Sequence, residues 1–174
     1  TAFSIISNHD GSIAASSKLY SGAAITLYLP ASNKPAESKA ETEEPFTPGA
    51  GRILLMDEKR VSDIAARILN FLGYEVAVAD HGAEAIELFN RAREEGEPFS
   101  AVILAQTIPG AMGGKETMHR LLQADPNVRG IVTTADASDP ILGQFQQSGF
   151  RGALNKPFKI EELSQMLYVT LSEG

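Results

Sequence analysis

Charged and hydroxyl side chains stand at the ends of short apolar runs in the second half of the chain. Asp57 and Glu58 follow the first run, Ala105 and Thr134 follow the third and fourth, and Lys156 follows the fifth. Two neighbouring carboxylates suit a hard divalent cation such as Mg²⁺. A lysine with a hydroxyl suits an anion, especially a phosphoryl group. Spacing alone leaves a plainer alternative equally open, in which Asp57 caps the following helix and Lys156 is a solvated loop charge.

These side chains meet only if the apolar runs are parallel strands of one sheet. From Arg52 to Gly174 such runs alternate with segments whose apolar residues recur at helical spacing. We expect strands at 53–56, 74–79, 101–104, 130–133 and 152–154, and helices marked by Val61–Leu72, Ala85–Ala92, Met118–Leu122, Ile141–Phe145 and Ile160–Leu171. This alternation predicts an α/β fold, a doubly wound five-stranded parallel sheet with helices on both faces. In such sheets, sites form outside the carboxyl ends of the strands.

Two shorter regions precede this one. Residues 1–30 read as the end of a helix that stops at Gly11, followed by two strands at 12–16 and 24–29. Residues 31–51 are rich in Pro, Gly and Glu and lack periodicity, which predicts a linker. A short charged helix over 37–44 is the alternative for that segment.

Composition excludes several classes of function. The 174 residues include 15 Lys and Arg against 22 Asp and Glu, a net charge of −7 that disfavours direct nucleic-acid binding. No cysteine occurs, which removes disulfides and thiol chemistry and fits a reducing, cytoplasmic location. No apolar run is long enough for a membrane span, and no signal peptide is evident. Because the chain begins at Thr1, we expect a processed chain or a fragment.

Other motifs are weaker. Gly113–Thr117 fails the phosphate-binding loop pattern because Glu116 stands where Ser or Thr is required. No glycine fingerprint follows any strand, so a nucleotide- or flavin-binding enzyme is disfavoured. Phe150 and Tyr168 are either aromatics at a partner surface or, as we favour, packed residues. The three histidines, at 9, 81 and 119, have neither metal-ligand spacing nor the partners of a hydrolase triad.

Five ordered blocks of the sequence resemble the receiver domain of two-component response regulators. They read ILLMDEKR, GYEVAVADHGAEAIELF, AVILAQTIPGAMGG, IVTTADAS and ALNKPF, and the resemblance runs from Arg52 to about Leu171. It implies a flavodoxin-like sheet of order 2-1-3-4-5. It also implies an aspartate after the third strand that accepts a phosphoryl group from a histidine kinase.

Carried over residue by residue, the resemblance gives roles to the residues at the strand ends. Asp57 and Glu58 match the acids that hold Mg²⁺, with Glu58 longer by one methylene than the usual aspartate. Thr134 and Lys156 match the hydroxyl and the lysine that contact the phosphoryl group. The bond between Lys156 and Pro157 is expected to be cis.

The phosphoacceptor position falls on Ala105, and this is the decisive departure from the family. A methyl group neither takes a phosphoryl group nor ligates a metal. No cofactor is therefore expected, and any Mg²⁺ site at Asp57 and Glu58 is weak or lost. Lys156 should then pair with one of these acids and hold one conformation. We expect a phosphorylation-independent interaction or regulatory module; the alternative is a phosphoaccepting receiver whose acceptor aspartate was replaced by mutation.

The first region resembles the last helix and hairpin of the ATP-binding domain of histidine kinases, in the run FSIISNHDGSIAASSKLYSGAAITLYLP. The glycine-rich lid and the Asn-bearing helix that hold ATP in that family are absent, so this segment is not expected to be an enzyme. Three segments follow one another along the chain: the kinase-domain remnant (1–30), the linker (31–51) and the receiver (52–174). This order implies the C-terminal part of a hybrid sensor histidine kinase, whose full-length parent would be a protein-histidine kinase. Expected partners are histidine-kinase domains of its own parent or a signalling protein, with a homodimer as a further option. We expect no nucleic acid and no membrane contact in this fragment, although its parent could be membrane-attached.

Overall fold

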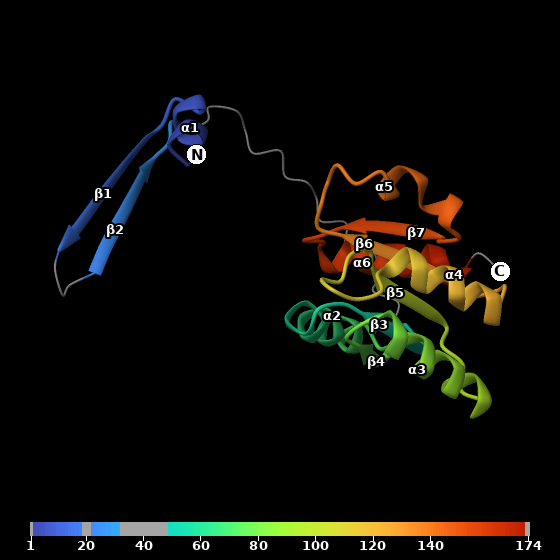
Figure 1. The fold of residues 1–174 in the computed structure, drawn as a ribbon. Coiled ribbons are helices and arrows are strands. Elements are labelled where there is room, and N and C mark those ends of the chain that lie inside the picture. The colour runs from blue at the N-terminus through green and yellow to red at the C-terminus, as the bar shows by residue number, and fades with distance from the viewer. Residues whose placement is uncertain (1, 19–21, 32–48, 173–174) are drawn as a thin grey trace. The chain divides into compact units, whose positions relative to one another are not determined.

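The structure, a computed structural model, describes residues 2–18, 22–31 and 49–172. The chain divides into two compact units, residues 1–46 and 47–174, and each has a sheet of its own (Figure 1).

The second unit is built around a five-stranded parallel sheet with strand order β4-β3-β5-β6-β7. This order is the 2-1-3-4-5 order implied by the family resemblance, so the fold prediction is confirmed. The strands are β3 (Arg52–Met56), β4 (Glu75–Ala79), β5 (Ala101–Ala105), β6 (Gly130–Thr134) and β7 (Gly152–Asn155). The helices are α2 (Lys59–Phe71), α3 (Gly82–Glu94), α4 (Gly114–Ala124), α5 (Ile141–Gln144), the 3₁₀ turn η1 (Phe145–Ser148) and α6 (Ile160–Ser172).

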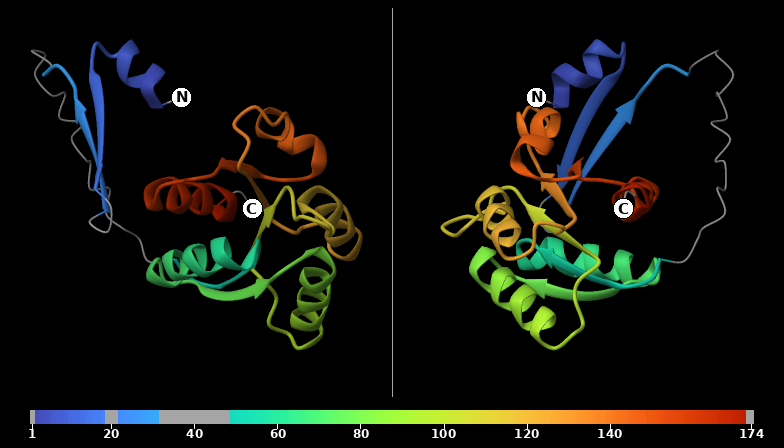
Figure 2. Two further views of the ribbon diagram at one scale, coloured as in Figure 1. Left: turned by 60° about the vertical axis from the view of Figure 1, so that its left-hand side comes forward. Right: turned by 90° about the vertical axis from the view of Figure 1, so that its right-hand side faces the viewer.

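Each face of this sheet is covered by helices, and the core therefore has two halves (Figure 2). Side chains alternate along a strand, so Leu54 and Met56 pack on one face while Ile53 and Leu55 pack on the other. Helices α3, α4 and α5 cover the first face, and α2 and α6 cover the second. The central strands are buried on both sides, which explains why they read as continuous apolar runs.

The helix expected over Ile141–Phe145 is shorter than predicted. Helix α5 ends at Gln144, whose φ of −130° and ψ of 17° leave the helical region, and η1 continues as a 3₁₀ turn. Gly143 lies within this short helix, and glycine is a poor helix former. Pro140 before it and the left-handed Gly149 after it limit the segment at both ends.

The first unit consists of α1 (Ala2–Asn8) and an antiparallel hairpin of β1 (Ser12–Lys18) and β2 (Gly22–Tyr28). The predicted helix stop at Gly11 is corrected, because Asp10 takes the left-handed conformation with a φ of 55°. Gly11 is required for space instead, since a Cβ there would lie 2.5 Å from the Tyr28 carbonyl oxygen. Large apolar side chains of this unit are exposed, namely Phe3, Ile5, Ile25, Leu27, Tyr28 and Leu29.

Most of the predicted linker, including the alternative helix over 37–44, lies outside the described residues. The described end of it, from Gly49, is part of the second unit and is hydrogen-bonded within it. The Gly49 amide donates to the Leu72 carbonyl at 2.8 Å, and the Gly51 carbonyl accepts from the Glu75 amide at 3.0 Å. Tyr74 beside this segment is buried, and burial raises the pKa of its phenol.

Among the described residues, no helix has both the length and the apolar character needed to cross a bilayer.

The packing at Gly73 gives a direct test of the fold. Gly73 has a φ of +94°, and a Cβ there would lie 2.7 Å from the Gly49 carbonyl oxygen. Gly96 has a similar φ of +79° but open space around it. A left-handed alanine costs about 1–2 kcal/mol by itself. We expect Gly96→Ala to lower the free energy of unfolding by about that amount and Gly73→Ala to lower it further. Urea unfolding followed by circular dichroism measures both, and equal losses would contradict the close approach.

Candidate functional site

Four of the residues singled out from the sequence lie at one edge of the sheet, namely Asp57, Ala105, Thr134 and Lys156. The register pairs Met56 with Leu104, Ala105 with Thr133, and Thr134 with Asn155, so the ends of β3, β5, β6 and β7 lie level with one another. Asp57 and Lys156 each follow the last residue of their strand. The parallel sheet thus brings the ends of distant segments to one small site, as predicted.

A buried ion pair occupies the centre of this edge. The Lys156 ammonium donates to both carboxylate oxygens of Asp57, at 2.9 Å to Oδ1 and 2.8 Å to Oδ2. The side chain of Asp57 is 5% exposed and that of Lys156 is 18% exposed. The Glu58 amide also donates to Asp57 Oδ1, at 2.9 Å. The predicted pairing of Lys156 with an acid is confirmed, and the alternative of a solvated lysine is wrong.

The two acids after β3 have different environments. Glu58 is exposed, and its carboxylate makes no ion pair within the described residues. Glu58, rather than Asp57, is the N-cap residue of α2, and it makes no side-chain capping bond. The alternative in which Asp57 caps the helix is therefore also wrong.

The loop after β7 has the backbone geometry implied by the resemblance. The peptide bond between Lys156 and Pro157 is cis. The Lys156 amide donates to the Thr134 carbonyl at 2.7 Å, which fixes this loop to the end of β6.

Ala105 is the last residue of β5 and is 1% exposed. Its methyl group offers no lone pair to a metal and no nucleophile to a phosphoryl group. Both oxygens of Asp57 are held by Lys156, and no cluster of three or more acidic, His or Cys residues that suits a metal occurs in the described parts of the chain. Mg²⁺ prefers six oxygen ligands including carboxylates. The donor set at this edge does not fit it.

Thr134 lies at the same edge, but its hydroxyl is engaged within its own loop. The residue is 5% exposed. Its Oγ1 accepts from the Asp136 amide and donates to Asp139 Oδ2, both at 3.2 Å. The structure therefore brings together Asp57 and Lys156, while the hydroxyl of Thr134 is directed to a residue that the sequence analysis did not single out.

The same loop holds a second hydrogen-bonded turn. The carboxylate of Asp136 accepts from the hydroxyl of Ser138 at 2.6 Å and from its amide at 2.8 Å. The Ser138 hydroxyl and then its amide lower the pKa of Asp136 below its ordinary value. These bonds stabilise the loop from Thr134 to Ile141 in one conformation.

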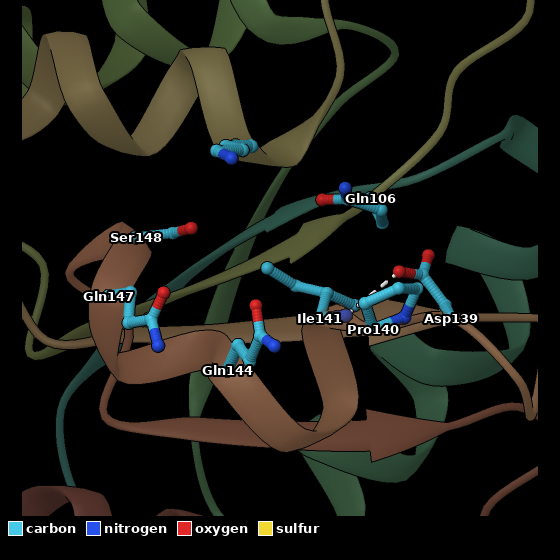
Figure 3. Close-up of a pocket in the computed structure, with 8 residues that line it drawn as sticks. Gln106, Asp139, Pro140, Ile141, Gln144, Gln147 and Ser148 are labelled. Atoms are coloured by element: carbon cyan, nitrogen blue, oxygen red, sulfur yellow. Dashed lines mark hydrogen bonds between the residues drawn. The ribbon is translucent and has the colours of Figure 1, made fainter.

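A hollow of about 260 Å³ lies beside this loop, between the start of α4 and α5 (Figure 3). Asp139, Pro140 and Ile141 form part of its wall, and Gln106 faces them. The Gln106 Oε1 atom is buried without a hydrogen-bond partner among the described residues. Sequence reasoning missed Gln106 and Asp139; the Asp139-Pro140 pair, a common helix-start signal, was the clue to the latter.

The remaining motifs have structural roles. Phe150 is buried, as favoured, whereas Tyr168 is 66% exposed on α6, which corrects that expectation. His81 is the N-cap of α3, and its Nδ1 accepts from the Glu84 amide at 3.2 Å. Gly113 is the N-cap of α4.

Comparison with known families matches residues 53–168 to the response regulator receiver domain. The chain belongs to this family. Its second unit is a receiver domain of two-component signalling, homologous both to kinase-associated receivers and to response regulators, and it is not a kinase domain. Receiver domains interact with kinases and other signalling proteins.

Three curated relatives illustrate the range of the family. A response regulator receiver protein of Anaeromyxobacter is 33% identical over 113 residues, which are 64% of this chain and 45% of that protein. Sporulation initiation phosphotransferase F of Bacillus subtilis is 31% identical over 116 residues, 64% of this chain and 86% of that protein. Sensor kinase CckA of Brucella abortus is 25% identical over 172 residues, 93% of this chain but 18% of that protein. The chain thus spans less than half of the first and a small part of the kinase.

Solved structures agree on the fold. The receiver domain of a sensor histidine kinase from Pseudomonas aeruginosa, described with a magnesium ion in its active-site cleft, has a TM-score of 0.62 at 24% identity and covers 72% of this chain and 100% of that one. A response regulator from Chloroflexus aurantiacus has a TM-score of 0.64 at 23% identity, over 72% of this chain and 100% of that one.

The ion pair gives a testable prediction. Lys156→Met leaves the Asp57 carboxylate buried without its cation, and breaking a buried pair in this way costs roughly 3–5 kcal/mol, somewhat less here because Lys156 is partly exposed. Adding Asp57→Asn removes the stranded charge, so we expect the double variant to regain much of the lost stability. Urea unfolding measures both proteins. A double variant no more stable than Lys156→Met would contradict a dependence on the pair.

Proposed function

We propose that this chain is part of a hybrid sensor histidine kinase: the end of an ATP-binding domain, a linker, and a receiver that works without being phosphorylated. The match to sensor kinase CckA supports this organisation because it covers 93% of the chain and so includes residues before the receiver. The exposed apolar side chains of β2, such as Ile25 and Leu27, support it as well. A hairpin with this surface is expected to pack against the rest of a larger domain.

The observation that carries the receiver's proposed mode of action is the buried methyl group of Ala105. In the family, an aspartate at this position accepts the phosphoryl group. Phosphorylation adds roughly −1.5 to −2 charge to a pocket. Here the lysine that would contact that charge is already neutralised by Asp57. The role of the domain is then to contact partners in one fixed state.

The proposed partners are histidine-kinase domains of the same parent or another signalling protein in the cytoplasm. A surface for such a contact is available on α6, where Tyr168 is 66% exposed and Val169 is 42% exposed. The same surface is a candidate for a homodimer. Since aromatic residues are enriched at interfaces, Tyr168→Glu should weaken either association.

Phosphoryl uptake tests the proposal directly. We expect the native chain, incubated with acetyl phosphate and Mg²⁺, to keep its mass in intact mass spectrometry because no acceptor carboxylate stands at position 105. Ala105→Asp restores the acceptor, and we expect that variant to gain the mass of one phosphoryl group. Ala105→Asn is the matched control, equal in shape but without the nucleophile.

A stoichiometric phosphoryl adduct on the native chain would contradict the proposal and would show that another residue accepts. Uptake by Ala105→Asp together with none by the native chain would also agree with the alternative, in which an acceptor aspartate was replaced by mutation. Binding of a partner distinguishes these two, because a phosphorylation-independent module binds equally well with Ala105 as with phosphorylated Asp at this position, whereas a phosphoaccepting receiver binds differently once the Asp is phosphorylated.

A further inference from the structure

The hydroxyl of Thr134 donates one hydrogen bond and accepts another inside its own loop. It has one proton to donate, and that proton goes to Asp139 Oδ2 at 3.2 Å. Its oxygen accepts from the Asp136 amide at the same distance. Thr134 is 5% exposed, so water does not readily substitute for these partners. A bond to a carboxylate is also stronger than one between neutral groups.

The same carboxylate connects Thr134 to the start of α5. Asp139 Oδ1 accepts from the Ile141 amide at 2.9 Å, an interaction drawn in Figure 3. The Asp139 carbonyl accepts from the Leu142 amide at 3.1 Å, and the Asp139 amide donates to the Asp136 carbonyl at 3.1 Å. The carboxylate that accepts from Thr134 thus also accepts from the first amide of α5.

Other groups near this loop do not compete for the carboxylate. Asp139 forms no ion pair with any residue that the structure describes, and Asp136 is occupied by Ser138. Lys115 lines the same hollow but is exposed. Among the residues that the structure describes, Asp139 is the charged group that accepts the Thr134 hydroxyl hydrogen bond.

We propose that Asp139 is a positioning residue: it accepts the Thr134 hydroxyl hydrogen bond that a phosphoryl group on an acceptor at position 105 would otherwise accept, and so keeps Thr134 from moving toward that group. This inference rests on the proposed function. It adds that Ala105 is not the only barrier: restoring an acceptor carboxylate leaves Thr134 bound to Asp139, so the loop does not follow phosphorylation.

A double-mutant cycle on the full chain tests the contact without any phosphoryl chemistry. Thr134→Val removes the hydroxyl. Asp139→Asn keeps an oxygen for the Ile141 amide but replaces the charged acceptor. A hydrogen bond to a charged group contributes about 1.5 kcal/mol or more. The effect of the double variant on the unfolding equilibrium constant should therefore be roughly tenfold smaller than the product of the two single effects.

Thr133→Val provides the matched control for this cycle. Thr133 is the preceding residue of β6, is 2% exposed, and has a hydroxyl without a partner among the described residues. The effects of Thr133→Val and Asp139→Asn on the unfolding equilibrium constant should multiply in the double variant. If the effects of Thr134→Val and Asp139→Asn multiply as well, Asp139 does not hold the hydroxyl and the inference is overturned.

The second experiment asks whether Asp139 keeps the loop after β6 from responding to phosphorylation. Backbone amide shifts of residues 134–141 are recorded by NMR for Ala105→Asp and for Ala105→Asp with Asp139→Asn, before and after acetyl phosphate and Mg²⁺. We expect phosphorylation to shift these amides only in the double variant, and adding Thr134→Val should abolish that shift. Equal shifts in both would overturn the inference. Failure of both variants to take up a phosphoryl group would count against position 105 as the acceptor position, which is part of the proposed function, and the mutant cycle would still decide the role of Asp139.

Discussion

The ion pair between Lys156 and Asp57 is the interaction on which this site depends. It joins residues 99 positions apart and connects the loop after β7 to the loop after β3, across the carboxyl edge of the sheet. Taking two charges out of water is costly, and the geometry must be good to offset that cost. Here the lysine bonds to both carboxylate oxygens, and the Glu58 amide satisfies one of them further.

The ion pair shows how the charges at this edge are balanced when position 105 has no carboxylate. In a receiver with an acceptor aspartate, the lysine and the acids form a charged pocket ready for a metal and a phosphoryl group. With Ala105 at the end of β5, Asp57 is the one buried counter-charge of the lysine among the described residues, and each partner is satisfied by the other. The hydroxyl of Thr134 is likewise satisfied by Asp139. The two groups to which the family resemblance assigns phosphoryl contact are both paired with carboxylates of the chain itself.

Much of this was predictable from the sequence. The central strands are buried on both faces, so runs such as Ile53–Met56 are apolar throughout and easy to recognise. Parallel strands then fix which residues share an edge, which placed Asp57 and Lys156 together. The cis bond before Pro157 followed from the family resemblance.

The features that the sequence did not predict depend on which of several similar side chains forms a given contact. Sequence spacing does not say which of two adjacent acids turns inward, and only Asp57 does. The hydroxyl of Thr134 had several polar residues within reach of its loop, and its choice of Asp139 depends on the turn that Pro140 helps to set. The early end of α5 was not predicted because the apolar spacing over 141–145 rests on the apolar residues alone. It carries no information about the glycine at 143 or the non-helical backbone of Gln144.

The most direct measurement of the central claim is phosphoryl transfer from a kinase rather than from a small molecule. A histidine-kinase domain labelled with radioactive phosphate is mixed with the native chain, and the label on each protein is followed after separation. A pocket with a methyl group for an acceptor and a lysine already neutralised should leave all the label on the kinase. Label retained by this chain would contradict that claim.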